Sequence, residues 1–346
     1  MVIINFWIKN YRIFAVMKTV KLFILLILLF VAFQQCSTDF DLNADYKDIT
    51  IVYGLFNQND STHYIKVNKA FLGEGDALIM AQDPANSNYG DEIEVRVEEW
   101  LQGSLTPEKV FSLDTIVVTN KEPGVFYYPE QVVYKFDEDN LSESKYKVII
   151  TNKISGNVVS AETELVENFS FEKPRPGSTS IEFSKPSTQY IGWKSANNGR
   201  LYEVRILFNY YEKDINTGVI DSNKYITWYL GSKRSTSLKG GDSMKKYYLT
   251  DNFFKNIKAK LPKDVNKERV AGEVTIVISV ASDEYAIYLD LNGPSNSIVQ
   301  ERPEYTNINN GIGLFASRYE KIKKISLTVD SKEYLKTMEL SFKDSF

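Results

Sequence analysis

The chain has 346 residues and a single cysteine, so no disulfide can form within it and a hydrophobic core alone must hold the fold. Four of the 41 basic residues and none of the 45 acidic residues precede Cys36, so the chain from Cys36 onward carries 37 basic against 45 acidic side chains, a formal net charge of −8. That balance disfavours a protein built to bind nucleic acid.

Residues 1–35 predict an export signal. Lys18 and Lys21 precede an apolar run over residues 22–33. The run is shorter than the roughly 20 residues that a membrane-spanning helix needs, which favours a signal peptide over a permanent span. Because Met17 directly precedes the basic start, translation from Met17 is an alternative to translation from Met1.

Cys36 directly follows the apolar run, and residues 37–41 are mostly polar or acidic. This placement resembles a lipobox, in which the signal peptidase cleaves before a cysteine that carries acyl chains, and two or more chains anchor a protein stably. The preceding Phe33-Gln34-Gln35 lacks the usual small residues, as in the relaxed lipoboxes of the Bacteroidota, where acidic residues after the cysteine resemble a surface-export signal. We predict lipidation of Cys36 and a tether over residues 36–47; the alternatives are an ordinary thiol or a secreted protein without lipid.

The pattern of residues 48–172 predicts a β-sandwich domain. Residues 49–56 and 63–71 are expected to form a hairpin. In a later strand Ile93, Val95, Val97 and Leu101 alternate with charged residues, and Trp100 falls on the charged face, where it either contacts a ligand or covers the rim of the sheet. Further strands are predicted at 115–119, 131–136, 146–151 and 158–166, with a loop at 80–89.

Two prolines and a glycine make residues 173–178 a predicted linker to a second β domain, residues 179–346, with short helical insertions. Trp193 followed by the strand 201–211 resembles the early half of a fibronectin type III domain, which implies that the tryptophan packs beneath that strand. Period-two alternation places Tyr202 to Tyr210 on a core-facing side. The other predicted strands are 180–183, 190–193, 224–230 and 273–280, and helices are predicted at 251–261 and 283–291.

The second half of the chain holds three pairs of adjacent aromatic residues, Tyr210-Tyr211, Trp228-Tyr229 and Tyr247-Tyr248, and neighbouring residues of a strand point to opposite faces. Each pair is therefore expected to bury one ring and to expose the other. Exposed rings can stack on a sugar or a peptide, although tyrosine is also common in strands for packing reasons. We name Tyr211, Trp228 and Tyr247, together with Trp100, as candidate ligand or partner contacts.

The stretch from Pro303 to Phe315 contains Thr306-Asn307-Ile308 and Asn310-Gly311, followed by Gly313 and Phe315. It resembles the closing motif of a group of Bacteroidota outer-membrane lipoproteins of unknown function. The resemblance implies a lipoprotein that works beside a TonB-dependent uptake system, and it supplies no catalytic residues. The residues themselves predict a structural motif: Asn310-Gly311 is a strong turn dipeptide, and Gly313 permits a close backbone approach before a final strand. A ligand-contacting loop is the alternative.

Catalytic and metal-binding patterns are sparse. His63 is the only histidine, it lies in an early strand and is expected at a sheet edge, and no nucleophile elbow surrounds a serine. We predict no enzyme, no cofactor and no metal site. A glycosidase needs only two carboxylates, so this class stays open.

The sequence thus predicts a mainly β, lipid-anchored protein on the periplasmic or cell-surface side of the outer membrane. We expect a binding or accessory component that takes an outer-membrane protein partner or a glycan or peptide ligand, and not nucleic acid. A glycan-active enzyme and a structural surface protein or adhesin are the alternatives. A pocket with two carboxylates and an exposed aromatic would favour the enzyme.

Overall fold

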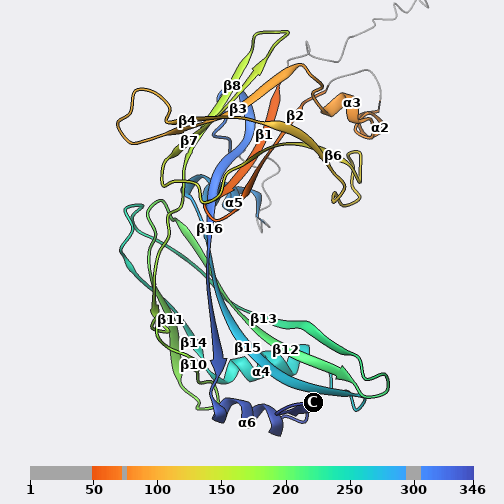
Figure 1. Ribbon diagram of the computed structural model, residues 1–346, viewed down its shortest axis with the longest axis vertical. Coiled ribbons are helices and arrows are strands. Elements are labelled where there is room, and N and C mark those ends of the chain that lie inside the picture. The colour runs from red at the N-terminus through yellow and green to blue at the C-terminus, as the bar shows by residue number, and fades with distance from the viewer. Residues whose placement is uncertain (1–48, 72–75, 294–304) are drawn as a thin grey trace, which may run out of the picture. The chain divides into compact units, whose positions relative to one another are not determined.

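The computed structural model describes residues 49–71, 76–293 and 305–346, which form a mainly β protein (Figure 1). The predicted signal peptide, Cys36, the tether and Pro303 lie outside the described residues. In the described ranges, no helix has the length and apolar character needed to cross a membrane.

The strands of the N-terminal half are β1 (Thr50–Asn57), β2 (Thr62–Lys69), β3 (Ile93–Trp100), β4 (Lys109–Ser112), β5 (Asp114–Val118), β6 (Gln131–Asp137), β7 (Lys145–Asn152) and β8 (Val158–Glu164). Those of the C-terminal half are β9 (Phe171–Lys173), β10 (Ser180–Ile181), β11 (Thr188–Lys194), β12 (Leu201–Asp214), β13 (Ile220–Arg234), β14 (Ser243–Leu249), β15 (Lys267–Ala281), β16 (Gly311–Leu327) and β17 (Phe342–Lys343). The helices are α2 (Ala77–Met80), α3 (Pro84–Ser87), α4 (Asp251–Lys260), α5 (Asp283–Asn292) and α6 (Val329–Thr337).

The first hydrophobic core lies between two layers of strands. β1 and β2 form the predicted antiparallel hairpin, and β6 and β5 extend that layer. β4, β3, β7 and β8 form a separate four-stranded sheet. Val52, Phe56 and Ile65 of the first layer and Val97 and Val148 of the second are fully buried in one cluster. The alternation of apolar and polar residues therefore builds a sandwich-like core.

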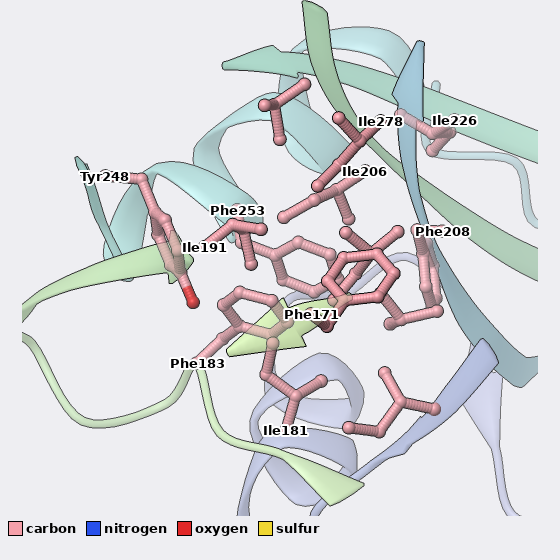
Figure 2. Close-up of a cluster of buried hydrophobic side chains, with 14 of the residues drawn as sticks. Phe171, Ile181, Phe183, Ile191, Ile206, Phe208, Ile226, Tyr248, Phe253 and Ile278 are labelled. Carbon is pink, nitrogen blue, oxygen red and sulfur yellow. The ribbon is translucent and has the colours of Figure 1, made fainter. Parts of the chain in front are cut away.

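The second core lies between β12, β13, β15 and β16 on one side and the three-stranded sheet β14-β11-β9 on the other. Trp193 of β11 is fully buried, and its ring centroid lies 5.7 Å from that of Tyr202 on β12, as the predicted packing requires. Helix α4 adds Phe253, which stacks on Phe183 with ring centroids 4.1 Å apart. Figure 2 shows aromatic and branched side chains of this core, with Ile191 and Ile206 from the two layers and Phe253 from the helix.

Strand β16 contributes to both cores. Its first half pairs in parallel with β1, and its second half pairs antiparallel with β15. Phe315 accordingly belongs to the first core and Ile325 to the second. β9 precedes the predicted linker almost entirely, yet it pairs with β11 of the second sandwich. The division into two domains at residues 173–178 stays a prediction, and the chain crosses between the two cores more than once.

The Asn-Gly motif holds the start of β16 in place. The Asn307 side chain donates from Nδ2 to the carbonyl oxygen of Phe315 at 2.6 Å and accepts from the Phe315 amide at 3.0 Å. Asn310 has a left-handed φ of 59°, and Gly313 has a φ of 118°. A Cβ on Gly313 would lie 2.0 Å from the carbonyl oxygen of Val52, so the predicted close backbone approach is confirmed.

His63 is buried inside the sheet and does not lie at an edge, contrary to our expectation. Its strand, β2, lies between β1 and β6. The ring packs 4.9 Å from that of Phe136, and Nε2 lies 3.0 Å from the carbonyl oxygen of Glu138. One backbone partner is enough to satisfy a histidine among aromatic neighbours, so His63 is a core residue.

Several other details differ from the sequence patterns. The predicted loop at 80–89 contains the one-turn helix α3, and α2, α6, β4, β9 and β17 have no counterpart among the predicted elements. β14 was not predicted, because Lys245 and Lys246 interrupt the alternation of apolar residues in this strand. Helix α4 forms as expected, but Thr250 and not Asp251 occupies its N-cap position, and Asp251 instead pairs with Lys255 at 2.6 Å.

Candidate binding surface

Two of the three aromatic pairs place their rings as predicted. Tyr247 has 61% of its surface exposed, whereas its neighbour Tyr248 has 8%. Burial raises the pKa of Tyr248 to about 12, since the phenolate would be poorly solvated. Tyr211 is likewise exposed while Tyr210 is buried. The outward-facing members, Tyr211 and Tyr247, are therefore accessible to a ligand.

The third pair has the opposite orientation from the one we named. Trp228 lies opposite Ile206 in the β12–β13 register, and cross-strand partners share a face, so Trp228 points to the core. Its ring centroid lies 5.5 Å from that of Tyr248. Tyr229, with 63% of its surface exposed, is the outward ring. Trp228 is thus a packing residue in this structure.

Trp100 lies at the end of β3, where its Nε1 donates to Glu98 Oε2 at 3.0 Å. This bond confirms that the tryptophan shares the charged face of the strand. Trp100 also lines a cavity of about 740 Å³ together with Glu162. That carboxylate lies 3.2 Å from the ammonium group of Lys145 and 3.6 Å from that of Lys147. The cavity joins the tryptophan ring to four carboxylates, of which Glu162 is ion-paired and Glu143, Glu164 and Glu167 form no ion pair within the described residues.

A cluster of tyrosine and lysine side chains lies on the outer face of the sheet β14-β11-β9. Tyr190 pairs with Tyr247 across β11 and β14, with ring centroids 5.5 Å apart. Lys173 and Lys245 are the register partners of Gly192 on either side, and their Nζ atoms lie 4.4 and 5.0 Å from the centre of the Tyr190 ring. We call these five residues the lysine–tyrosine platform.

Gly192 makes room for this arrangement. A Cβ at Gly192 would lie 3.0 Å from Cε2 of Tyr190, closer than the two groups can pack without a shift. The ring therefore lies over the glycine, where both lysines reach it. On the other face of the same strand, Ile191 and Trp193 are fully buried in the second core, so the platform rests on a rigid base.

The platform carries positive charge that the chain does not neutralise. Within the described residues, Lys173 and Lys245 form no ion pair, and Lys173 donates to a neutral side-chain oxygen at 2.7 Å. The neighbouring carboxylate of Glu172 is already engaged: a hydrogen bond from Ser243, the Lys194 ammonium group and the field of Lys245 lower its pKa. A lysine over an aromatic face gains about 0.5–1 kcal/mol at an exposed site, which orders the ammonium group without cancelling its charge.

The other cavity with two carboxylates lies on the outer face of β12, β15 and β16 and measures about 500 Å³. Arg205 lies between Glu203 and Glu320, at 3.5 and 2.5 Å. Ser279 also donates to Glu320. A glycosidase requires the sugar between its two carboxyl groups, and here one guanidinium group engages both. This arrangement suits a structural ion network better than acid–base catalysis.

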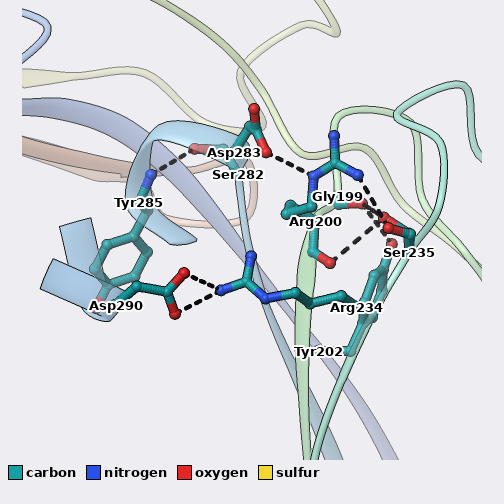
Figure 3. A network of polar contacts seen from close by, with 9 residues as sticks. All are labelled: Gly199, Arg200, Tyr202, Arg234, Ser235, Ser282, Asp283, Tyr285 and Asp290. Atoms are coloured by element: carbon teal, nitrogen blue, oxygen red, sulfur yellow. Dashed lines mark hydrogen bonds and ion pairs between the residues drawn. The ribbon is translucent and has the colours of Figure 1, made fainter. Parts of the chain in front are cut away.

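A further polar network attaches helix α5 to the strands (Figure 3). Arg200 reaches Asp283 in the first turn of the helix at 2.6 Å and also donates to the carbonyl oxygen of Ser235. Arg234 donates to both carboxylate oxygens of Asp290 at 2.6 Å. Each charge is met by a partner of opposite sign, so the network fixes the helix and leaves no free acid or base.

No metal site emerges from the described residues, because they contain no group of three or more His, Cys, Asp or Glu side chains that could hold an ion. Sequence reasoning found one platform residue, Tyr247. It missed Tyr190, Gly192, Lys173 and Lys245. The pairing of Tyr190 with Tyr247 could have revealed them, but that pairing is known only once the register of β14, an unpredicted strand, is known.

Comparisons with known proteins do not assign a family. No protein-family model matches the chain, and no curated protein matches it. Among solved structures, the C-terminal globular domain of an oligosaccharyltransferase from Pyrococcus abyssi is similar at a TM-score of 0.27 and 13% identity. The match covers 67% of this chain and 47% of that chain, less than two thirds of its length. A likeness this weak carries no functional argument.

Proposed function

We propose that this protein is a lipid-anchored, outer-membrane binding protein that holds its ligand on the lysine–tyrosine platform without changing it chemically. The observation that carries the proposal is the platform itself: an exposed ring, Tyr247, lies beside two ammonium groups that form no ion pair in the described residues. Aromatic rings offer apolar contact area with little conformational entropy to lose, and unpaired cations attract an opposite charge.

The cellular location in this proposal follows from the sequence. The apolar run ending directly before Cys36 and the acidic residues after it support an anchor, and two or more acyl chains make such an anchor stable. The resemblance of the Asn307-to-Phe315 motif to outer-membrane lipoproteins supports the same location and adds an uptake system as the expected protein partner.

A binding role is preferred to a glycan-active enzyme because three of the cavity carboxylates are already engaged by cations, whereas Glu143, Glu164 and Glu167 of the cavity beside Trp100 form no ion pair within the described residues and are the groups that the enzyme alternative would use. Glu162 is held by two lysines, and Glu203 and Glu320 share Arg205. General acid catalysis requires a carboxyl group that can deliver a proton to a bound substrate. The structural-protein alternative predicts no saturable ligand at the platform.

The anchor is tested by intact mass and membrane fractionation of the natively expressed protein beside Cys36→Ala, with Ser37→Ala as a matched control. We expect the wild type and Ser37→Ala to begin at an acylated Cys36 and to sediment with membranes, and Cys36→Ala to lack the acyl mass and to leave the membrane. An unacylated, released wild type would contradict the anchored protein. Release of reducing ends from any bound polysaccharide would contradict a non-catalytic role.

A further inference from the structure

We infer that the ligand of the lysine–tyrosine platform is an acidic glycan, a polysaccharide whose sugars carry carboxylate or sulfate groups. This inference rests on the proposed function and names its ligand class. The sugar ring would stack on Tyr247, and the anionic group would pair with Lys173 and Lys245. Tyr190 and Gly192 act as positioning residues that hold the two ammonium groups.

The charge of the ligand follows from the two lysines. Both ammonium groups lie over one ring, so they are within roughly 9 Å of each other, the sum of their distances to its centre. Two like charges at this separation repel, and neither ammonium group forms an ion pair within the described residues, although Lys245 lies close enough to Glu172 for its field to act on that carboxylate. Glu172 at the border is occupied by Ser243 and Lys194. An anion bound between the lysines removes the repulsion and gains two charge-assisted hydrogen bonds.

The sugar component follows from Tyr247. Its ring stands beside the cations on the same sheet face and is 61% exposed, so one ligand unit can reach both. The apolar C–H face of a pyranose ring packs on an aromatic ring, while its substituent reaches to the side. A polar tip on an apolar body suits a ligand of this mixed character.

Two other polyanions fit less well. Nucleic acid needs a broad positive surface, and the chain from Cys36 onward has 37 basic against 45 acidic residues. An anionic membrane surface is engaged by apolar side chains that enter the lipid together with clustered basic residues. The platform presents two tyrosines and two lysines, and Leu249 on β14 is the exposed aliphatic side chain next to Tyr247 on this face, which is a small apolar surface for entry into lipid.

Binding is measured with the full, natively processed protein in detergent, using polygalacturonate as the acidic probe and dextran as the neutral one. Tyr247→Ala removes the stacking ring, and Tyr225→Ala is its matched control, since Tyr225 is also 61% exposed but lies on β13 outside the platform. The double change Lys173→Gln and Lys245→Gln removes the cations. Lys258→Gln with Lys324→Gln is the charge-matched control, because both of these lysines are exposed and lie elsewhere.

We expect saturable binding of polygalacturonate that weakens as salt increases, and no measurable binding of dextran. Tyr247→Ala should weaken binding roughly tenfold, and the platform lysine pair should weaken it roughly tenfold and flatten the salt dependence. Both control variants should stay within about twofold. Thermal melts establish that each variant is folded.

The inference is overturned if polygalacturonate does not bind, if dextran binds equally well, or if the platform variants match their controls. None of those outcomes touches the anchor, which is read from the mass and fractionation of Cys36→Ala. If polygalacturonate binds through the platform but is cleaved, the ligand class stands and the non-catalytic role fails.

Discussion

Replacing Gly313 with alanine should destabilise the protein severely. Its φ of 118° is a conformation that side chains other than glycine rarely adopt, which costs about 1–3 kcal/mol. The added Cβ would lie 2.0 Å from the carbonyl oxygen of Val52, so β1 and β16 must separate locally. Losing two of their hydrogen bonds costs about 1–3 kcal/mol more. We therefore expect a loss of roughly 2–6 kcal/mol, a large share of the ~5–15 kcal/mol that stabilises a typical domain.

Two other glycines separate the contributions. Gly218 has a φ of 73° with no atom within 4 Å of its virtual Cβ, so Gly218→Ala measures the backbone term alone. At Gly311 the virtual Cβ lies 2.7 Å from the carbonyl oxygen of Thr50 without a positive φ, so Gly311→Ala measures the contact. Urea unfolding followed by circular dichroism gives the midpoints. The reasoning is refuted if Gly313→Ala loses no more stability than Gly218→Ala.

Three further predictions concern buried groups. Although desolvation opposes ionisation, hydrogen bonds from three hydroxyl groups lower the pKa of Glu182 to about 2, so the stability that its charge contributes is complete above pH 4.5 and is lost as the pH falls toward 2. In urea unfolding, Glu182→Gln should therefore cost roughly 1–2 kcal/mol at pH 7, after solvent screening, and nothing near pH 2. An equal loss at both pH values would contradict this. Arg269→Met should cost about 2–4 kcal/mol, because Glu212 loses its buried partner at 2.9 Å and keeps only the more exposed Lys224 at 3.5 Å. Adding Glu212→Met should restore part of that loss, and no recovery would argue against the pair. Trp228→Ala should cost about 3 kcal/mol and Tyr229→Ala no more than about 0.5 kcal/mol, and similar melting temperatures for the two would show that the orientation is wrong.

Among the strands that sequence reasoning recovered, β12 has the clearest pattern, because its apolar side chains recur at every second position without interruption from Tyr202 to Phe208. Tyr202, Val204, Ile206 and Phe208 carry the period-two pattern through β12, and all four side chains are fully buried. Such strands specify their own core face. The pairing of β16 with β1 could not be predicted, because a contact between strands more than 200 residues apart leaves no local pattern, although Gly313 marked the close approach.

The error at Trp228 has a local physical cause. The aromatic pair indicates that one ring faces inward but does not indicate which one. The choice follows from the period of two within β13: Trp228 shares its face with the buried Ile226, and its β12 partner is the buried Ile206. The register shift between Val204 and Arg205 comes after both rings along β13 and does not reverse their faces. The larger ring of the pair, Trp228, therefore packs on the core, and the smaller ring, Tyr229, is exposed.

The platform lay beyond sequence reasoning for a related reason. Lys173 was assigned to a linker, and Lys245 lies in a strand whose consecutive lysines conceal its alternation. Only the register of three strands brings both residues beside Gly192. At that position a Cβ would lie 3.0 Å from Cε2 of Tyr190, so the ring would have to move by a few tenths of an ångström. The absence of a Cβ at Gly192 thus lets the ring lie where both ammonium groups reach it, and the proposed binding chemistry draws on a residue that offers no functional group of its own.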